Sequence, residues 1–129
     1  MKVSFNINQQ SMEDMFVTAL EGGSNYWYWL HESEVAKIRK AVPKSEEECL
    51  SVALSRAVMQ HGVEVSIHDY EDQESLLGII SMDTIEKRLQ KLADSEESWA
   101  LQSMMADDMD GNTADVIFQY ITLGEVVFG

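Results

Sequence analysis

One acidic loop in the sequence has residue types that suit a divalent cation. Its carboxylates are Asp107, Asp108 and Asp110. The pattern Asp-x-Asp-Gly is similar to the centre of an EF-hand loop, which binds Ca²⁺ through oxygen ligands. If Gly111 takes the place of the invariant glycine, Ala106 stands at the first ligand position and Ile117 at the bidentate glutamate position. Neither side chain can bind a cation, so we expect a solvated loop and keep the three aspartates as candidate binding residues only.

The histidines and the cysteine are poorly placed for metal or nucleophile chemistry. His31, His61 and His68 are not at the i, i+4 spacing of helical ligand pairs, and zinc needs at least three convergent protein ligands. Cys49 lies close to an expected helix start, which favours a thiolate, but three glutamates precede it and oppose one. We therefore expect no bound metal ion and a Cys49 that is buried as a small hydrophobic residue.

Two further catalytic patterns are missing from the sequence. There is no Gly-x-Ser-x-Gly turn for a serine nucleophile. The glycine cluster Gly22-Gly23-Ser24-Asn25 lacks the lysine of a phosphate-binding loop, so a helix stop explains it better. The sequence thus predicts no catalytic residue and no cofactor. An enzyme would require distant carboxylates or histidines to meet in a cleft.

An aromatic run is the most distinctive binding candidate. Its members are Tyr26, Trp27, Tyr28 and Trp29. Alternation along a strand would place the tyrosines on one side and the tryptophans on the other. Such rings are enriched at interface hot spots and stack on flat ligands, but rings of this kind also fill protein cores. If two of the four point outward they form an exposed apolar ridge, and the sequence leaves core and surface placement open.

The charge of the chain restricts its partners. Nine basic residues face 23 acidic ones, which gives a formal net charge of −14. No Lys or Arg follows Lys91, and none lies in the acidic stretch 57–86. Such a surface repels phosphate backbones, so we expect no direct nucleic-acid binding and an attraction for a basic protein or for cations. The alternative is that the charge only keeps the protein soluble.

Length and composition are those of one domain. The chain has 129 residues, of which 45% are hydrophobic, enough for a single core. No apolar run approaches the roughly 20 residues of a membrane span, and no signal-peptide pattern is seen at the start. With one cysteine there is no disulfide framework. We expect a cytoplasmic protein, with monomer and homodimer both open.

Hydrophobic periodicity predicts the elements. Alternation predicts a strand at 3–7 and another at 63–67, while periodicity leaves 25–30 open as a short strand or an extended loop. A polar turn and an apolar run at 76–80 follow the second strand and predict an antiparallel hairpin. Helical spacing predicts a first helix at 11–20, capped by Ser11 and stopped by Gly22-Gly23, and a second at 33–42. A third, which we expect to be central and well buried, follows a capping box at 45–48 and closes at His61-Gly62.

Three more helices are expected in the second half of the chain. They open at Asp83, Ser95 and Asn112, and Gly124 stops the last before an apolar tail at 126–128. We expect Met104 and Met105 to point inward from the second of them. The fold class is α+β, with a small antiparallel sheet, made of the N-terminal strand and the central hairpin, covered by about five to six helices.

Two stretches resemble small uncharacterised proteins of bacteriophages, prophages and other mobile elements. One runs from Ala19 to Trp27, and the other from Thr113 through Gly124 to Gly129. The resemblance implies a phage or prophage origin and no known activity, and it carries over no site residues. It also implies that the aromatic run and the last helix form one structural unit.

These observations favour a non-enzymatic acidic accessory protein that binds a basic host or phage protein. A sharper version has the acidic surface imitating nucleic acid, which requires carboxylates at phosphate-like spacing on one continuous face. The alternative is a small-molecule-binding protein that uses residues 26–29, which requires a cavity beside Trp27 or Trp29 with convergent polar groups.

Overall fold

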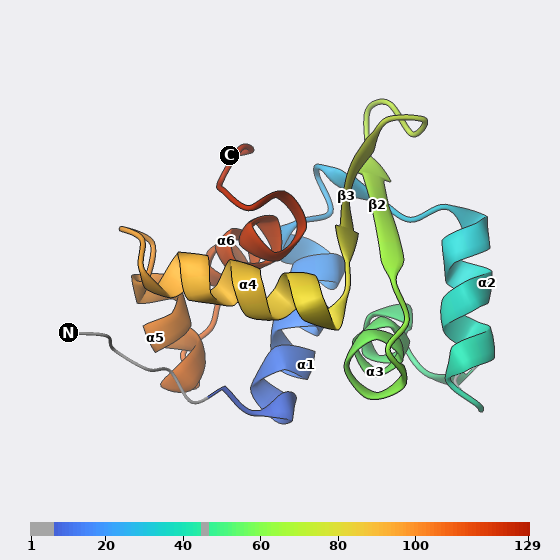
Figure 1. Cartoon of the computed structure of the whole chain (residues 1–129), viewed down its shortest axis with the longest axis horizontal. Coiled ribbons are helices and arrows are strands. Elements are labelled where there is room, and N and C mark those ends of the chain that lie inside the picture. The colour runs from blue at the N-terminus through green and yellow to red at the C-terminus, as the bar shows by residue number, and fades with distance from the viewer. Residues whose placement is uncertain (1–6, 45–46) are drawn as a thin grey trace.

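The computed structural model describes residues 7–44 and 47–129. These residues form six α-helices, one π-helical turn and three strands (Figure 1). In chain order the elements are α1 (Gln9–Thr18), η1 (Ala19–Gly23), β1 (Tyr28–Trp29), α2 (Glu32–Ala41), α3 (Leu50–His61), β2 (Val65–Asp69), β3 (Leu76–Ile80), α4 (Met82–Ala93), α5 (Trp99–Met105) and α6 (Gly111–Leu123). The predicted α+β class is confirmed. Within the described ranges, no helix has both the length and the apolarity needed to cross a membrane.

The sheet has three antiparallel strands in the order β1-β2-β3. The predicted hairpin is confirmed, with Val65 opposite Ile80 and a register shift between Ile67 and His68. The third strand is β1, in which Trp29 pairs with His68. The strand predicted at 3–7 lies almost entirely outside the described residues.

Helix α6 is the centre of the fold. Every side chain from 113 to 122 is buried. The helix packs against α1, η1, α4, α5 and β3, and Figure 1 shows it behind α4 and beneath the C-terminal segment. An α-helix with apolar residues on most of its circumference is stable only when neighbours cover it on all sides. We expected α3 in this central place, but α3 packs on α1 and α2 and keeps Arg56 and Gln60 outside its buried face.

Two glycines allow α6 to approach its neighbours backbone to backbone. A Cβ atom on Gly23 would lie 2.3 Å from the carbonyl oxygen of Gly111, at the start of α6. A Cβ atom on Gly78 would lie 2.1 Å from the carbonyl oxygen of Thr122, near its end. No side chain fits at either distance, so η1 and β3 contact α6 at these points only because both residues are glycine.

Several helix ends differ from the sequence prediction. Asn8, not Ser11, caps α1, and its side chain accepts a hydrogen bond from the N–H of Ser11. The prediction that Gly22-Gly23 is a left-handed stop is wrong, because α1 runs on into η1 and neither glycine has a positive φ. The stops at Gly62 and Gly124 are confirmed by φ values of 65° and 85°.

The remaining helix starts and two burial predictions also need correction. Helix α4 begins behind a capping box of Ser81 with Thr84, not at Asp83. The N-cap residue of α5 is Ser98 rather than Ser95, and that of α6 is Asp110 rather than Asn112. Helix α3 begins at Leu50 with Cys49 as its N-cap residue, and residues 45–46 of the expected capping box lie outside the described residues. Cys49 is exposed rather than buried. Met105 is also exposed, because it points away from the face on which Ala100, Leu101 and Met104 meet the core.

Candidate functional site

The aromatic run splits between core and surface. Trp27 is 2% exposed, and its ring stacks on Phe128 with centroids 5.2 Å apart and an interplanar angle of 10°. Trp27 also packs against Phe118 of α6. Tyr26 is 46% exposed. The sequence left core and surface placement open, and the structure gives Trp27 to the core and Tyr26 to the surface.

A buried carboxylate joins this run to α6. Asp115 is 7% exposed and accepts four hydrogen bonds within the described part of the chain. Its Oδ1 accepts from the Ser24 hydroxyl at 2.7 Å and from the Trp27 indole N–H at 2.8 Å. Its Oδ2 accepts from the Tyr26 hydroxyl at 2.6 Å and from the Gln119 amide at 3.1 Å. Hydrogen bonds to an ionised acceptor are about twice as strong as neutral ones, so Asp115 fixes the conformation of the loop from Ser24 to Trp27.

Gln119 attaches the C-terminal segment to the same network. Its side-chain oxygen accepts hydrogen bonds from the backbone N–H groups of Val127 and Phe128, at 2.8 and 2.9 Å. Its amide also donates to the Phe128 carbonyl at 3.1 Å. Gln119 is fully buried, and these bonds hold the Phe128 ring against Trp27. The interpretation that the aromatic run and the last helix form one structural unit is confirmed by these contacts.

An open cavity of about 810 Å³ lies between η1, α6 and the C-terminal segment. We call it the Tyr26 cavity, and its lining residues are Val17, Thr18, Glu21, Gly22, Gly23, Tyr26, Gly111, Asn112, Asp115, Val116, Gln119, Val126, Phe128 and Gly129. Glycines on both sides keep the wall free of side chains where η1 meets α6. The lining also carries the hydrogen-bonded groups of Tyr26, Asp115 and Gln119. Ten of its fourteen lining residues fall within residues 19–27 and 113–129.

The two tyrosines of the run are held in the neutral form. Burial, the hydrogen bond to Asp115 and the charge of that carboxylate raise the pKa of Tyr26 to about 12. Burial and the charge of Glu21 raise the pKa of Tyr28 to about 12. The Tyr28 hydroxyl donates to the Leu20 carbonyl at 2.7 Å. Both phenols therefore act as hydrogen-bond donors near neutral pH, not as bases.

Tyr28 and Trp29 contribute to a second, smaller cavity of about 260 Å³. It is lined by Asn25, Tyr28, Trp29, Leu30, Val35, Leu50 and Tyr70. Trp29 is half-buried and meets the exposed Tyr70 edge to face, with centroids 6.2 Å apart. This site is smaller than the Tyr26 cavity, and its polar residues are Asn25 and the two tyrosines.

The predicted acidic loop serves mainly to start α6. Asp110 is the N-cap residue of α6 and accepts from the N–H and hydroxyl of Thr113, at 2.8 and 2.9 Å. Those two hydrogen bonds hold the pKa of Asp110 below its usual value. Asp107 and Asp108 are exposed, and Asp107 has a positive φ of 56°. Among the described residues, no group of three or more His, Cys, Asp or Glu side chains is arranged to hold a metal ion.

Two histidines that are far apart in the sequence meet beside the sheet. The rings of His31 and His68 stack with centroids 3.7 Å apart, and His31 Nε2 forms a hydrogen bond with the Gln73 carbonyl. His68 Nδ1 is buried and has no hydrogen-bond partner in the described structure. Burial and the neighbouring His31 lower the pKa of His68, while Glu34 opposes this shift. We expected such a convergence only as a chance of tertiary structure, and two imidazoles stacked face to face do not point their nitrogens at a common metal.

Sequence reasoning missed Asp115 and Gln119. Both lie on α6 at i, i+4 spacing, a position that normally indicates a solvent-facing pair. The available signal was the surrounding sequence, because residues 116–121 are otherwise all apolar or aromatic. A polar pair inside a helix of that kind has to be buried and hydrogen-bonded.

No protein-family model matches the chain, and neither the curated proteins nor the solved structures contain a significant match. A function for the protein therefore has to be proposed from the geometry of the described residues.

Proposed function

We propose that the protein is a non-enzymatic binding protein whose ligand enters the Tyr26 cavity. The observation that carries the proposal is the cavity itself, a concave site of about 810 Å³ with convergent polar groups. Ligand sites are commonly concave and about 300–1,000 Å³ in volume, with an apolar lining and a few placed polar groups. Tyr26 and Asn112 supply such groups, and Val17, Val116 and Val126 supply apolar wall.

The wall of the cavity is fixed before any ligand arrives. Tyr26 is held by Asp115, and Asp115 is itself held by donors from Ser24, Trp27 and Gln119. A binding site whose side chains are already ordered loses less conformational entropy when a ligand binds. The hydrogen-bond network of Asp115 thus orders side chains that line the Tyr26 cavity. This arrangement supports a role in ligand binding in addition to a role in stability.

The proposal is tested by recording amide NMR spectra of the labelled protein with a library of small neutral, anionic and cationic fragments. Binding in the cavity shifts the amides of Gly22, Gly23, Asn112 and Gly129 together. A Gly22→Trp variant should abolish these shifts, since Gly22 lines the cavity, has no positive φ, and a Cβ there meets no described atom within 4 Å. Val127→Trp is the control, because Val127 is 57% exposed and lies beside the cavity without lining it. A library that produces no clustered shift would contradict the proposal.

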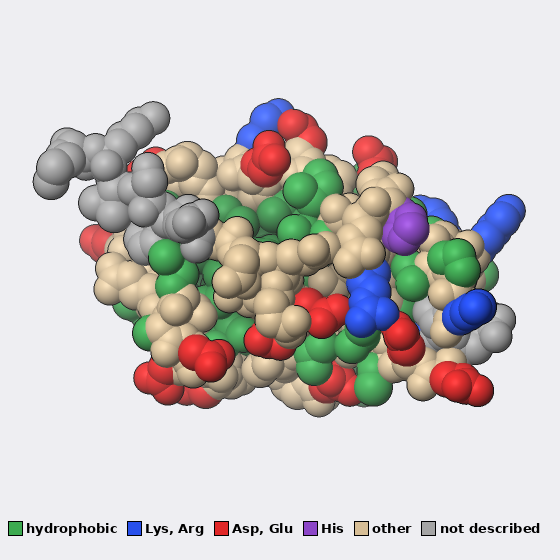
Figure 2. Space-filling model, turned by 90° about the horizontal axis from the view of Figure 1, so that it is seen from below, with side chains coloured by type: hydrophobic (Ala, Val, Ile, Leu, Met, Phe, Trp, Pro, Cys, Tyr) green, Lys and Arg blue, Asp and Glu red, His purple; other side chains and the backbone are tan. Residues whose placement is uncertain are grey.

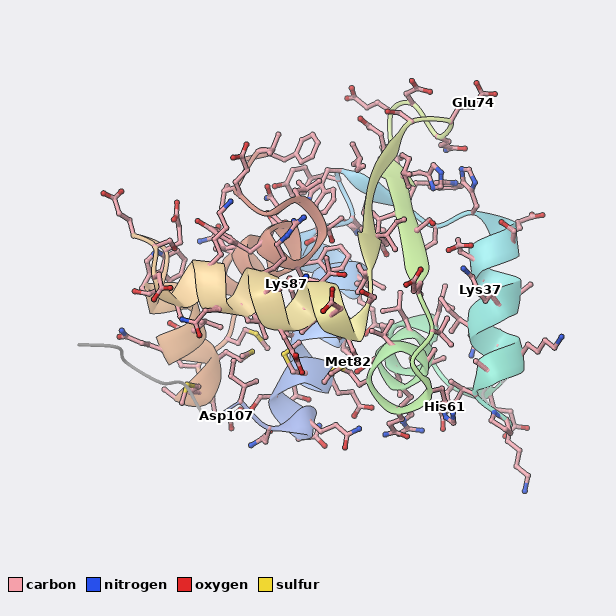
Figure 3. All side chains as sticks on the ribbon, viewed as in Figure 1. Lys37, His61, Glu74, Met82, Lys87 and Asp107 are labelled. Carbon is pink, nitrogen blue, oxygen red and sulfur yellow. The ribbon has the colours of Figure 1, made fainter. Side chains whose placement is uncertain are left out.

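A second candidate function is recognition of a basic protein partner by the acidic surface. The net charge of −14 favours it, because complementary charge accelerates and orients association. On the face that Figure 2 shows, however, the described carboxylates do not form one continuous array. Glu74 at the hairpin tip and Asp107 at the α5–α6 turn lie at opposite ends of the molecule (Figure 3). On the face in Figure 2, acidic side chains lie in separate groups among uncharged atoms.

This distribution favours a local acidic contact over imitation of a nucleic-acid backbone. The hairpin tip carries three exposed carboxylates within four residues, Glu71, Asp72 and Glu74. The α5–α6 turn is equally dense, but its Asp110 is engaged in capping α6. The test is a pull-down from host lysate at low and high salt, with the triple amide variant Glu71→Gln/Asp72→Asn/Glu74→Gln as comparison. A basic protein that is retained only at low salt, and lost with the variant, is the expected result. Retention that the variant does not change would exclude the hairpin tip. The phage or prophage origin stays a prediction.

A further inference from the structure

The charged groups in the wall of the Tyr26 cavity have one sign. Glu21 is exposed at its edge and Asp115 lies at its base. Among the described lining residues, none is Lys, Arg or His. The donors to Asp115 are a hydroxyl, a phenol, an indole and an amide, all of them uncharged. The carboxylate is therefore solvated by neutral dipoles without a counter-ion, and the potential in the cavity stays negative.

The same wall offers aromatic and aliphatic surface. Tyr26 and Phe128 both line the cavity, and Phe128 is held in place by its stacking on Trp27. The electron-rich faces of aromatic rings attract ammonium and guanidinium groups within about 6 Å. Val17, Val116 and Val126 can cover a short alkyl chain.

We propose that the ligand of the Tyr26 cavity is an organic cation, an ammonium or guanidinium group on a short alkyl stem. The inference rests on the proposed function, since it names the chemical class that the same cavity takes. The charged group is attracted by the carboxylates and the aromatic rings of the lining, and the stem lies against the valines. An anion of the same size is excluded by the two carboxylates and by the net charge of −14.

The test compares three probes with the same stem: n-butylammonium, n-butanol and butyrate. Each is titrated into the labelled protein while the amides of Gly22, Gly23, Asn112 and Gly129 are followed. We expect n-butylammonium to bind about tenfold more tightly than n-butanol, which corresponds to about 1.4 kcal/mol. Butyrate should produce no shift. The affinity for n-butylammonium should fall as salt is added, because added ions screen the carboxylates.

Two variants that each remove one negative charge distinguish a contact between Glu21 and the cation from a general effect of the protein's net charge. Glu21→Gln removes the carboxylate at the cavity edge, and Glu74→Gln removes an exposed carboxylate at the hairpin tip. We expect the first to weaken n-butylammonium binding about three- to tenfold and the second by less than twofold. Equal effects from both variants would overturn the inference, since they would show a response to net charge only.

The remaining outcomes separate failure of the inference from failure of the proposed function. If n-butanol or butyrate binds as tightly as n-butylammonium, the cavity binds ligands but the cationic class is wrong. If none of the three probes nor any library fragment shifts the cavity amides, the proposed function fails as well. A capped pentapeptide with a central lysine identifies the source of the cation. Tighter binding of the peptide than of n-butylammonium points to a side chain of a partner protein, and weaker binding points to a free amine.

Discussion

The indole N–H of Trp27 donates a hydrogen bond of 2.8 Å to Asp115, 88 residues further along the chain. A buried tryptophan needs a partner for this donor, and a buried carboxylate needs donors for its oxygens. Each residue thus supplies what the other requires. Because the same carboxylate also holds Ser24 and Tyr26, one pair of residues connects the core packing of Trp27 to the wall of the Tyr26 cavity.

Replacement of Asp115 should destabilise the fold strongly. In Asp115→Ala the buried donors of Ser24 and Trp27 lose their acceptor inside the protein, and leaving a buried polar group unpaired costs about 1–3 kcal/mol. We expect a loss of about 3 kcal/mol or more in the free energy of unfolding. Asp115→Asn keeps one acceptor oxygen and should lose about 1–3 kcal/mol. Urea unfolding followed by tryptophan fluorescence measures both. Asp108→Asn, at an exposed position, should change stability by less than about 0.5 kcal/mol.

Replacement of the adjacent residues Gly22 and Gly23 by alanine should have opposite effects on stability. Gly23→Ala places a methyl group 2.3 Å from the Gly111 carbonyl oxygen, so η1 and α6 have to separate. Overpacking of this kind typically costs about 1–3 kcal/mol and occasionally more, and we expect the upper part of that range. Gly22→Ala meets no described atom within 4 Å and should be neutral, or stabilising by about 0.4–1 kcal/mol. Thermal unfolding of the two variants checks this, and equal melting temperatures would refute the close packing of η1 on α6.

The elements that were predicted correctly are those with a local cause. The β2–β3 hairpin follows from period-2 alternation in its first strand and a short apolar run in its second, separated by a polar turn. The stops at Gly62 and Gly124 follow from the left-handed conformation that glycine tolerates. The role of Gly23 could not be predicted in this way. Its requirement comes from the Gly111 backbone, which reaches it through the tertiary fold.

The site was predicted only in part for the same reason. Residues 26–29 were identified from their types, but whether a ring is buried depends on what covers it. Trp27 is buried because Phe128 and Phe118 pack on it, and Tyr26 is exposed because the open cavity lies beside it. Asp115 carries no distinguishing local pattern, since its donors come from a loop about 90 residues away in the sequence.

Removal of the Gln119 amide should release the C-terminal segment. Gln119→Met keeps the volume and flexibility of the side chain but cannot accept the hydrogen bonds from Val127 and Phe128. We expect amide exchange at these two residues to accelerate by tenfold or more, since tenfold corresponds to about 1.4 kcal/mol. Hydrogen exchange followed by NMR measures the effect. Amides of α3, for example Leu54, serve as an internal control, and faster exchange there as well would indicate global rather than local loosening.

The free energy of unfolding should fall as the pH drops from 7.5 to 5.5, because His68 becomes protonated in this range more readily in the unfolded state. Burial and the stacked His31 lower the pKa of His68 from its ordinary value of 6.5, so the folded state prefers the neutral ring. The unfolded state therefore binds more protons, and the contribution is present above pH 6.5 and lost below it. Glu34, which is paired with Lys37, faces the same ring. Burial opposes the ionisation of Glu34, but hydrogen bonds from Ser66 and Lys37 lower its pKa from the ordinary value of 4.5. The contribution of Glu34 to stability is therefore lost only at a pH below 4.5, outside the tested pH range.

Chemical unfolding at the two pH values checks this prediction. His68→Gln should flatten the dependence, while His61→Gln, at an exposed helix end, should leave it unchanged. His31→Gln removes one cause of the lowered pKa and should reduce the slope. An unchanged slope in His68→Gln would assign the pH dependence to other groups.

Alkaline titration should report the Tyr26 network directly. The pKa values of Tyr26 and Tyr28 are raised from 10.0 to about 12. The folded protein therefore holds the phenol protons more tightly than the unfolded chain does, and this difference contributes to its stability. This contribution is fully present below pH 10 and is lost as the pH rises through 12. Ultraviolet absorbance of tyrosinate after rapid pH jumps measures the pKa values before unfolding. Asp115→Asn should lower the pKa of Tyr26 alone, and Glu21→Gln should lower that of Tyr28 alone, since each carboxylate raises the pKa of its own neighbour. The two variants are thus each other's control, and a shift of both tyrosines in either one would show a general loosening instead of two separate contacts.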